Sequence, residues 1–305
     1  MLMLPDTIRV AAAQYPIDAV ATIAAWQDKI ARWVAEGAAT GADLLVFPEY
    51  AAIEQAHALG ADVYGDLNAT LEAVAGLAGE RIQFHLELAK RHGVHILVGS
   101  GPLAREDGRY VNAAQLVTPA GAVGEQHKLI LTPFERDWGM AAGREIVVFE
   151  TSLGRMATTI CYDSEFPYLA RAMVSAGAEL LLVPQCTERI SGHHRVRTGA
   201  LSRALENQIA TVTSPTIGDA LWSAAVDHNT GAAGIYVPAE HGVSDNGVLA
   251  EGRLNEPAWV TAVVDFRHLR QLRSGGEMRN YVDWLEQPGA MEAAGHAPTT
   301  VIDLR

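Results

Sequence analysis

Short apolar runs alternate with longer amphipathic segments along most of this 305-residue chain. Near the N-terminus, Thr7–Ala13 predicts a buried strand, and Ala19–Thr40 predicts a helix because Ile23, Trp26 and Ile30 recur at helical spacing. The same patterns predict strands at Asp43–Phe47, His95–Gly99, Ile146–Glu150, Met156–Ile160, Leu180–Val183 and Ile209–Ser214, and helices at Thr70–His92, Tyr168–Ala176 and Gly192–Gln208. Strands that alternate with helices in this way indicate an α/β fold.

Other segments are typical of hairpins, short strands and an extended end. A hairpin around Pro119–Gly121 is predicted to join Tyr110–Thr118 to Ala122–Glu125. In the last third of the chain, Asn, Asp and Gly turns separate short predicted strands at Ala224–Asp227, Ala232–Val237, Val248–Ala250 and Trp259–Val264, and Arg267–Arg273 predicts a short helix. Pro288–Arg305 is low in apolar residues, so we expect one domain over residues 1–287 and a tail or arm over 288–305.

Two distant stretches resemble each other. Gly41–Glu49 and Gly177–Gln185 each read as a helix stop, an apolar strand, a proline and a polar residue. One interpretation is that the chain has two similarly built α/β halves, whose sheets pack together with helices outside. The other is that both stretches are a common strand pattern of α/β proteins.

The charge balance and the cysteine count narrow the class of protein. The formal net charge is −13 and no basic run is present, which argues against nucleic acid or an anionic membrane as the main partner. Two cysteines are too few for a disulfide framework, and residues 1–5 lack the features of a signal peptide. We therefore expect a cytoplasmic protein, either an enzyme or a small-molecule binder, with no membrane span.

Three chemically active side chains follow predicted strands. Cys161 comes at the end of Met156–Ile160, Glu49 follows Asp43–Phe47, and Lys128 follows the hairpin. A thiol attacks only as thiolate, so it needs a base or a nearby positive charge. A partly buried carboxylate can take the thiol proton, and an ammonium can stabilise an oxyanion. Taken singly, each has an ordinary interpretation: a buried small residue, a helix cap and a surface lysine.

Three sequence blocks resemble the signature motifs of the nitrilase superfamily of carbon–nitrogen hydrolases. They are Phe47–Glu49, His127–Leu129 and Ile160–Pro167, in the order and at the approximate spacing of that family. The resemblance implies Glu49 as general base, Lys128 as electrostatic stabiliser and Cys161 as nucleophile. It also implies that Glu135 is a second glutamate that positions the substrate and orients Lys128, and that the Tyr162 backbone N–H is an oxyanion donor.

The same resemblance implies a four-layer α-β-β-α sandwich and an amidase-like reaction without a cofactor. Cys161-Tyr162-Asp163 is similar to the amidase form of the block, whereas nitrilases proper usually carry Cys-Trp-Glu. The expected reaction is hydrolysis of a small linear carboxamide through a cysteine thioester. A nitrilase, an amide-forming N-acyltransferase and a non-catalytic binding module are the alternatives. Relatives often form dimers through the helix after the cysteine, so a homodimer or a higher homo-oligomer through Tyr168–Ala176 is expected.

Several further residues are candidates for the pocket. Gln185 and Cys186 follow the strand that matches the one before Glu49, so both are expected to bind substrate, although Cys186 is equally well read as a buried small residue. Trp138 and Trp222 are candidate pocket walls, with core packing as the alternative. His193 and His194 are adjacent and have no partners at ligand spacing, so no metal site is expected.

Overall fold

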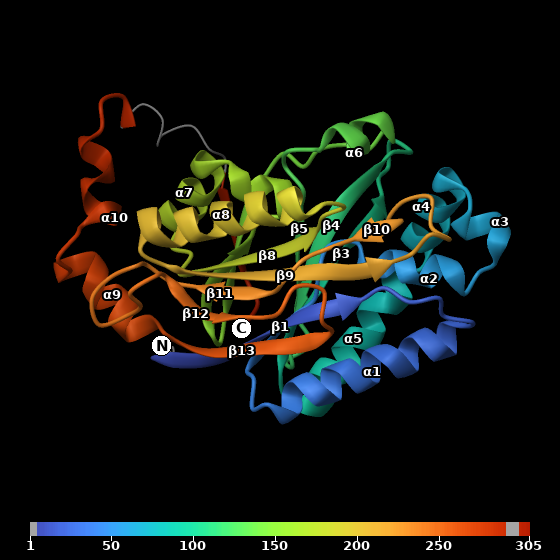
Figure 1. Cartoon of the computed structure of the whole chain (residues 1–305), viewed down its shortest axis with the longest axis horizontal. Coiled ribbons are helices and arrows are strands. Elements are labelled where there is room, and N and C mark those ends of the chain that lie inside the picture. Colours follow the sequence, from blue (N-terminus) through green and yellow to red (C-terminus); the bar gives the residue numbers. More distant parts are fainter. Residues whose placement is uncertain (1–4, 291–298) are drawn as a thin grey trace.

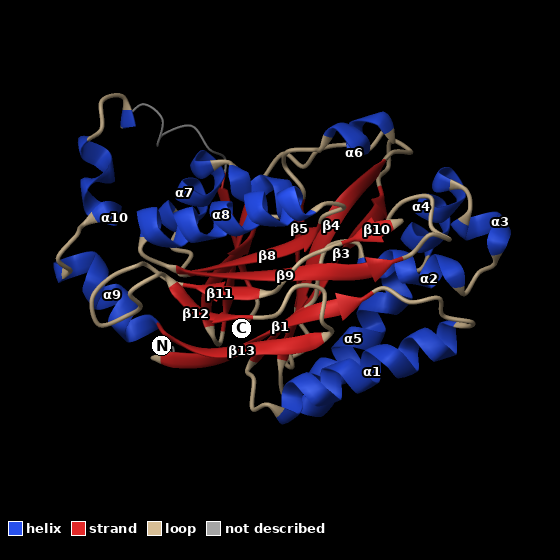
Figure 2. Cartoon of the chain, viewed as in Figure 1, coloured by secondary structure: helices blue, strands red, loops and turns tan. Residues whose placement is uncertain are grey.

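The computed structural model describes residues 5–290 and 299–305, and its elements form four layers (Figures 1 and 2). Two halves of a sheet pack face to face around one apolar core, and helices cover the outer face of each half. This architecture confirms the predicted α-β-β-α sandwich. Residues 1–4, part of the segment judged to lack a signal peptide, lie outside the described part of the chain.

The first half of the sheet contains the five N-terminal strands and one strand from near the end of the chain, in the order β13-β1-β2-β3-β4-β5. These strands are β1 (Thr7–Pro16), β2 (Leu44–Val46), β3 (His95–Ala104), β4 (Tyr110–Val117), β5 (Val123–His127) and β13 (Ala258–Asp265). Strands β1, β2 and β3 run parallel, while β3, β4 and β5 form an antiparallel meander. Parallel strands buried on both faces read as continuous apolar runs, which is why β1 and β2 were visible in the sequence.

The second half has the order β14-β6-β7-β8-β9-β11-β12. Its strands are β6 (Ile146–Thr151), β7 (Gly154–Thr158), β8 (Leu180–Cys186), β9 (Ala210–Asp219), β11 (Gly234–Tyr236), β12 (Val248–Glu251) and β14 (Thr299–Asp303), and the two-residue strand β10 (His228–Asn229) pairs with β9. The halves are joined where β1 and β9 run parallel, with Tyr15 opposite Thr216 and Pro16 opposite Ile217.

Helices cover both outer faces of the sandwich. On the first half, α1 (Ile23–Ala39) and α5 (Ala78–His92) bury an apolar stripe against the sheet. On the second half lie α7 (Pro167–Ser175) and α8 (Ile190–Asn207). The short helical elements are η1 (Ala51–Ile53), α2 (Glu54–His57), α3 (Ala61–Tyr64), α4 (Leu67–Gly76), α6 (Pro133–Asp137), η2 (Cys161–Glu165), α9 (Phe266–Gly275), α10 (Asn280–Asp283) and η3 (Trp284–Glu286). No helix within the described ranges is long and apolar enough to cross a bilayer.

The two similar stretches are matching strands of the facing halves, as the first interpretation predicted. Leu44 of β2 and Leu180 of β8 point into the same central core. Their neighbours Leu45 and Leu181 point outward, each against the helices of its own half. Because side chains alternate along a strand, a central strand between two apolar layers must be apolar at every position.

The predicted helix Thr70–His92 is two helices, α4 and α5, separated at Leu77. Gly76 immediately precedes the break, and glycine is a weak helix former. The buried Arg81 side chain donates to the Val74 carbonyl at 3.1 Å, so it satisfies one of the free carbonyl groups at the end of α4.

The predicted strand Ala224–Asp227 is wrong. Ser223 begins a turn there, because its hydroxyl accepts hydrogen bonds from the N–H groups of Ala225 and Val226, both at 3.1 Å. A serine that bonds to the backbone two and three residues ahead competes with strand pairing. The segment is a loop beside the strand ends rather than part of the sheet.

Strand β8 continues past the proline that was expected to end it. Pro184 pairs with Ser214, and the ladder with β9 runs on to Cys186. The paired residues of β7 end opposite Leu182, so the last residues of β8 have a strand partner on one side only. A proline is tolerated where only one neighbour requires hydrogen bonds.

Part of the expected tail is a strand. Residues 291–298 of it lie outside the described residues, but β14 pairs in parallel with β6, from Thr299 opposite Ile146 to Asp303 opposite Glu150. Leu304 then enters the central core. The end of the chain therefore contributes to the sandwich itself.

Candidate active site

Glu49 lies just beyond β2, at the junction of the two sheet halves. Its backbone carbonyl accepts a hydrogen bond from Thr216 Oγ1 on β9 at 2.6 Å. Strand β3 approaches the preceding Pro48 so closely that a Cβ at Gly99 would lie 2.1 Å from the Pro48 carbonyl oxygen. Gly99 has a φ of +87°, so both its conformation and its lack of a side chain are required. This packing fixes Glu49 with its carboxylate almost fully buried.

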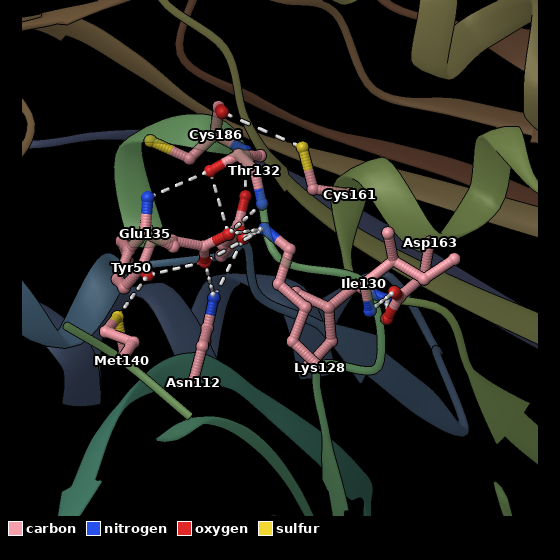
Figure 3. A network of polar contacts seen from close by, with 12 residues as sticks. Tyr50, Asn112, Lys128, Ile130, Thr132, Glu135, Met140, Cys161, Asp163 and Cys186 are labelled. Carbon is pink, nitrogen blue, oxygen red and sulfur yellow. Dashed lines mark hydrogen bonds and ion pairs between the residues drawn. The ribbon is translucent and has the colours of Figure 1, made fainter. Parts of the chain in front are cut away.

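Lys128 immediately follows β5 and points at that carboxylate. Its backbone N–H donates to the Asn112 carbonyl at 2.8 Å, which continues the β4–β5 pairing by one residue. The ammonium Nζ donates to Glu49 Oε1 at 2.7 Å and also lies 2.9 Å from Glu135 Oε2. Figure 3 shows Lys128 and Glu135 pointing toward one another within this polar network.

Glu135 is held by the start of helix α6. Thr132 is the N-cap, and the two side chains form a capping box in which Glu135 Oε2 accepts the Thr132 N–H at 2.9 Å. The other oxygen, Oε1, accepts the Tyr50 hydroxyl at 2.7 Å. Local helix capping therefore orients a carboxylate that also contacts Lys128.

Cys161 stands at the sharp turn between β7 and helix α7. Its φ of +49° is in the left-handed region, which is uncommon for residues other than glycine. Ser164 Oγ donates to the Cys161 carbonyl at 2.7 Å and helps to hold this turn. The thiol points toward the Cys186 carbonyl, 3.7 Å away (Figure 3).

The two buried carboxylates have opposite electrostatic environments. Burial raises the pKa of Glu49, and Lys128 only partly offsets this effect. Burial also acts on Glu135, but Lys128 and the hydrogen bonds from Thr132 and Tyr50 outweigh it and lower the pKa of that group. Two adjacent carboxylates with separated pKa values are suited to different tasks: Glu135 stays ionised, and Glu49 can gain and lose a proton.

The thiol and the ammonium complete this charge arrangement. Burial, followed by the negative charge of Glu49, raises the pKa of Cys161 well above its usual value. Burial would lower the pKa of Lys128, but the carboxylates of Glu49 and Glu135 raise it well above the ordinary value. Burial therefore favours the protonated thiol, so nucleophilic attack requires a base, and Glu49 is the carboxylate whose charge acts on Cys161.

Asn112 is a member of this network that the sequence did not reveal. Its Nδ2 donates to Glu49 Oε1 at 2.9 Å and to Glu135 Oε1 at 3.0 Å. The amide therefore bridges two like charges from the buried strand β4 (Figure 3). In the sequence, the only indication of this role was a polar residue within the otherwise largely apolar strand β4.

Asp163 and Tyr50 were also missed as site residues. Asp163, two residues after the nucleophile, is buried and accepts hydrogen bonds from three backbone N–H groups. Tyr50 directly follows Glu49, with a φ of +58°, and its hydroxyl contacts Glu135. In both cases the signal was adjacency to a predicted catalytic residue.

A cavity of about 700 Å³ opens above these groups. Glu49, Lys128, Glu135 and Cys161 lie in its wall, so the structure brings the four predicted catalytic residues together at one cavity. The remaining lining comes mainly from α6, η2, the start of α8, the loop of residues 223–227 and the short strand β10. This volume is in the range of small-molecule sites.

The predicted pocket residues fall into two groups. Tyr162, Cys186 and Trp138 line the cavity. Gln185 does not: it is fully buried, and its amide donates to the Ala232 carbonyl at 3.4 Å. Trp222 also lies outside the lining, where its ring packs on that of His57 with centroids 5.0 Å apart.

Within residues 5–290 and 299–305, no three His, Cys, Asp or Glu side chains are grouped so that they could hold a metal ion.

Comparison with known proteins identifies relatives over most of the chain. Residues 9–241 match the family model described as carbon-nitrogen hydrolase. A probable hydrolase of Bacillus subtilis, YhcX, is 31% identical over 277 residues, which cover 90% of this chain and 53% of that protein. An (R)-stereoselective amidase of a Pseudomonas species is 33% identical over 177 residues (58% and 60%), and the nitrilase blr3397 of Bradyrhizobium diazoefficiens is 30% identical over 196 residues (61% and 60%). The chain spans about half the length of the curated relatives it matches.

Solved structures show the same fold at low sequence identity. Saccharomyces cerevisiae Nit3, described as a member of branch 10 of the nitrilase superfamily, superposes with a TM-score of 0.69 at 20% identity, covering 90% of this chain and 96% of that one. An amidase from a Nesterenkonia species gives a TM-score of 0.63 at 21% identity, covering 90% and 97%. At these identities the likeness concerns the architecture.

Proposed function

The chain belongs to the carbon–nitrogen hydrolase family, and from this premise we propose that it hydrolyses the C–N bond of a linear carboxamide to a carboxylic acid and ammonia or an amine. The observation that carries the proposal is the convergence of Cys161, Glu49 and Lys128 at one cavity. These residues lie far apart in the sequence, on segments after β7, β2 and β5. Each is a type that acyl transfer requires.

In the first half of the proposed reaction, Glu49 takes the proton of the Cys161 thiol. The sulfur attacks the carbonyl carbon of the amide, and the negative charge on oxygen is stabilised by the Lys128 ammonium and, as the motif implies, by the Tyr162 backbone N–H. Glu49 then gives its proton to the departing nitrogen. The C–N bond breaks, and a thioester remains on Cys161.

In the second half, a water molecule takes the place of the departed ammonia or amine. Glu49, again ionised, removes a proton from the water as its oxygen attacks the thioester carbonyl. The C–S bond breaks, the acid leaves, and the proton on Glu49 returns to the sulfur. The raised pKa of Glu49 supports this shuttle, because a carboxylate that must accept and release protons works best with a pKa closer to the ambient pH.

A nitrile is the second candidate substrate, because nitrilases are among the similar curated proteins. The same three residues would serve that reaction. The amide is favoured because Tyr162 and Asp163 follow the nucleophile, as in the amidase form of the motif. Asp163 is short enough to lie within the turn, where it contacts the backbone on both sides.

Ammonia release from a panel of primary amides and their matching nitriles tests the proposal. We expect release from at least one amide at a rate exceeding that of its nitrile, and no release by Cys161→Ala, checked by circular dichroism for folding. Rapid mixing followed by intact-mass measurement should show an acyl adduct on Cys161. An added amine that becomes acylated would favour the N-acyltransferase alternative. Full activity in Cys161→Ala would refute the mechanism.

We also propose that the partner is a small-molecule amide and that the protein is cytoplasmic. We propose further that it forms a homodimer or a higher homo-oligomer through Tyr168–Ala176. Light scattering of the purified protein tests the oligomeric state.

A further inference from the structure

The main chain of Cys186 contacts both groups that exchange the proton in the proposed reaction. Its N–H donates to Glu49 Oε2 at 2.9 Å, and its carbonyl accepts from the Cys161 thiol at 3.7 Å. Figure 3 shows the carbonyl oxygen of Cys186 on the side of Cys161, with its sulfur directed elsewhere. The position of this single residue therefore affects the relative placement of Glu49 and Cys161.

Cys186 lies where strand pairing gives limited support. It is the last residue of β8 and pairs with Thr216 of β9. On the other side, the ladder with β7 ended four residues earlier, opposite Leu182. A strand end with one neighbour is easily displaced unless side chains fasten it.

Asn229 provides such a fastening. Its Oδ1 accepts the Cys186 thiol at 3.0 Å. Its Nδ2 donates to two backbone carbonyls, Gly218 at 3.0 Å and Val226 at 2.9 Å, and the residue is buried. The acceptor that faces Cys186 is therefore fixed on the opposite side by two further hydrogen bonds.

The neighbouring pair strengthens the same connection. Thr187 Oγ1 donates to the Thr230 carbonyl at 2.6 Å, and the Thr230 N–H donates to the Thr187 carbonyl at 2.8 Å. Residues 186–187 are thus joined to residues 229–230 by one thiol, one hydroxyl and one backbone hydrogen bond. Of these contacts, only the thiol belongs to the residue that touches the catalytic pair.

We propose that Asn229 is a positioning residue that acts through the Cys186 side chain to hold the Cys186 peptide against Glu49 and Cys161. The inference rests on the proposed roles of those two residues. Without the Asn229 acceptor, the thiol of Cys186 turns and the end of β8 relaxes. Glu49 then loses a donor to Oε2, and the Cys161 thiol loses its alignment.

Direct contact with substrate is the competing explanation, because Asn229 also lines the cavity. The two explanations predict different rates for the reaction of Cys161 with a small alkylating reagent. A positioning residue changes the intrinsic reactivity of Cys161, whereas a substrate contact changes KM and leaves that reactivity intact. The reaction of Cys161 with iodoacetamide is therefore the informative measurement, with peptide mass mapping to separate Cys161 from Cys186.

The experiment compares Asn229→Ala, Cys186→Ala, their double variant and Cys186→Ser. We expect each alanine variant to alkylate Cys161 roughly ten- to a hundredfold more slowly, as a small misplacement of reacting groups can cause. The double variant should be no slower than either single one, because both remove the same connection. Cys186→Ser retains a hydroxyl donor for Asn229 and should stay within about threefold of the parent. Thermal unfolding of each variant identifies any that do not fold.

Asn255→Gly is the matched control. Asn255 Oδ1 accepts from the Thr230 hydroxyl at 2.9 Å and the Gly231 N–H at 2.8 Å, so it supports the same loop without contacting Cys186. Asn255 has a φ of +60°, which glycine adopts without strain. We therefore expect Asn255→Gly to alkylate Cys161 at the parent rate. Normal alkylation in folded Asn229→Ala, or additive losses in the double variant, would overturn the proposal. Because alkylation needs no amide turnover, that result is separate from a failure of the proposed function.

Discussion

The carboxylate of Asp163 accepts a hydrogen bond from the Ile130 backbone N–H at 2.7 Å, although the two residues are 33 positions apart. Its second oxygen accepts the N–H groups of Leu129 and Ile160, both at 3.2 Å. One side chain therefore joins the segment after Lys128 to the turn that carries Cys161 (Figure 3). We conclude that Asp163 sets the relative position of the ammonium and the thiol.

Replacing Asp163 by asparagine should disrupt this connection. An amide has one acceptor oxygen, so its NH₂ group must face at least one backbone N–H that the carboxylate now satisfies. A buried donor left without an acceptor costs about 1–3 kcal/mol, and we expect that loss in urea unfolding together with at least a tenfold fall in kcat. Asp66→Asn is the control, because Asp66 is the N-cap of α4 and asparagine caps equally well. Parent-like stability in Asp163→Asn would contradict this role.

The same variant has a defined pH dependence. Burial raises the pKa of Asp163 to about 7, despite the opposing effects of Lys128 and the three N–H groups. Between about pH 4 and pH 7, the folded protein keeps a proton that the unfolded chain has released, so this group stabilises the protein less as the pH rises. Asparagine does not titrate, so this contribution to the pH dependence of stability is absent from the variant. The difference in unfolding free energy between parent and variant should therefore narrow from pH 4 to pH 7.5, and a widening difference would show that Asp163 is ionised throughout.

Lys128→Met should leave two buried carboxylates without their cation. Removing one partner of a buried ion pair typically costs about 3–5 kcal/mol. Without the ammonium, the pKa of Glu49 rises further and the pKa of Glu135 is no longer held below its ordinary value. The lost stability should therefore be greatest at neutral pH and partly recovered near pH 4. Denaturant titrations at the two pH values measure this difference. Lys90→Met, on the exposed face of α5, should show no such dependence, and an equal loss at both pH values would argue against the charge arrangement.

Glu49 should control the acid side of the pH profile. The proposed mechanism requires its ionised form. Burial and the negative charge of Glu135 raise the pKa of Glu49, although the nearby Lys128 ammonium lowers it. The kcat/KM value should therefore fall with decreasing pH at an inflection above the ~4.3 of an ordinary glutamate. Glu49→Gln should lose at least roughly a hundredfold in kcat, as expected for a general base. An acid limb that persists unchanged in residual Glu49→Gln activity would assign it to another group.

Glu49 and Cys161 were readable because each comes just after a buried strand, whereas Lys128 follows the polar hairpin strand β5 and was recognised through its sequence block. Pro48-Glu49 and the turn at Cys161 interrupt continuous apolar runs, and such an interruption marks the end of a buried strand. Strand ends in an α/β sheet meet at one edge, so residues distant in sequence converge there. The match between β2 and β8 was readable for a related reason, since both are buried on two faces.

The features that escaped prediction depend on distant partners. Asn112 could be recognised as a polar residue within a strand, but its bridging of Glu49 and Glu135 requires the folded arrangement of three segments. Similarly, Thr299–Asp303 becomes a strand because it pairs with β6, which is remote in the sequence. Strand formation of this kind is set by tertiary context more than by local propensity.

Asn112→Asp should reduce activity more than Asn112→Ala. In the parent, the Asn112 amide donates to the carboxylates of Glu49 at 2.9 Å and Glu135 at 3.0 Å. Aspartate would place a third carboxylate at about these distances from the other two, where like charges disfavour ionisation. Mutual repulsion would force at least one group to remain protonated, and Glu49 already has the raised pKa. We expect kcat/KM at pH 7 to fall at least tenfold further than in the alanine variant. Similar values for the two variants would mean that the amide only fills space.

Leu304→Ala should reveal whether the end of the chain is part of the core. Leu304 is 3% exposed, and its N–H donates to the Glu150 carbonyl at 2.8 Å. It packs so tightly that a Cβ at Gly124 would lie 2.8 Å from Leu304 Cδ1 and 2.6 Å from the Phe149 ring. Truncating a buried leucine costs about 2–5 kcal/mol.

Val301→Ala on the same strand provides the comparison. Val301 is 46% exposed, so its truncation should change the free energy of unfolding by no more than about 0.5 kcal/mol. Urea titrations of both variants measure this difference in stability. Leu304 belongs to the central core and not to the cavity wall, so the kcat of Leu304→Ala, measured well below its melting temperature, should equal that of the parent. If β14 packs on the sheet, truncating its buried leucine must cost more than truncating its exposed valine. Equal stabilities for the two variants would therefore mean that β14 adds little to the stability of the sandwich.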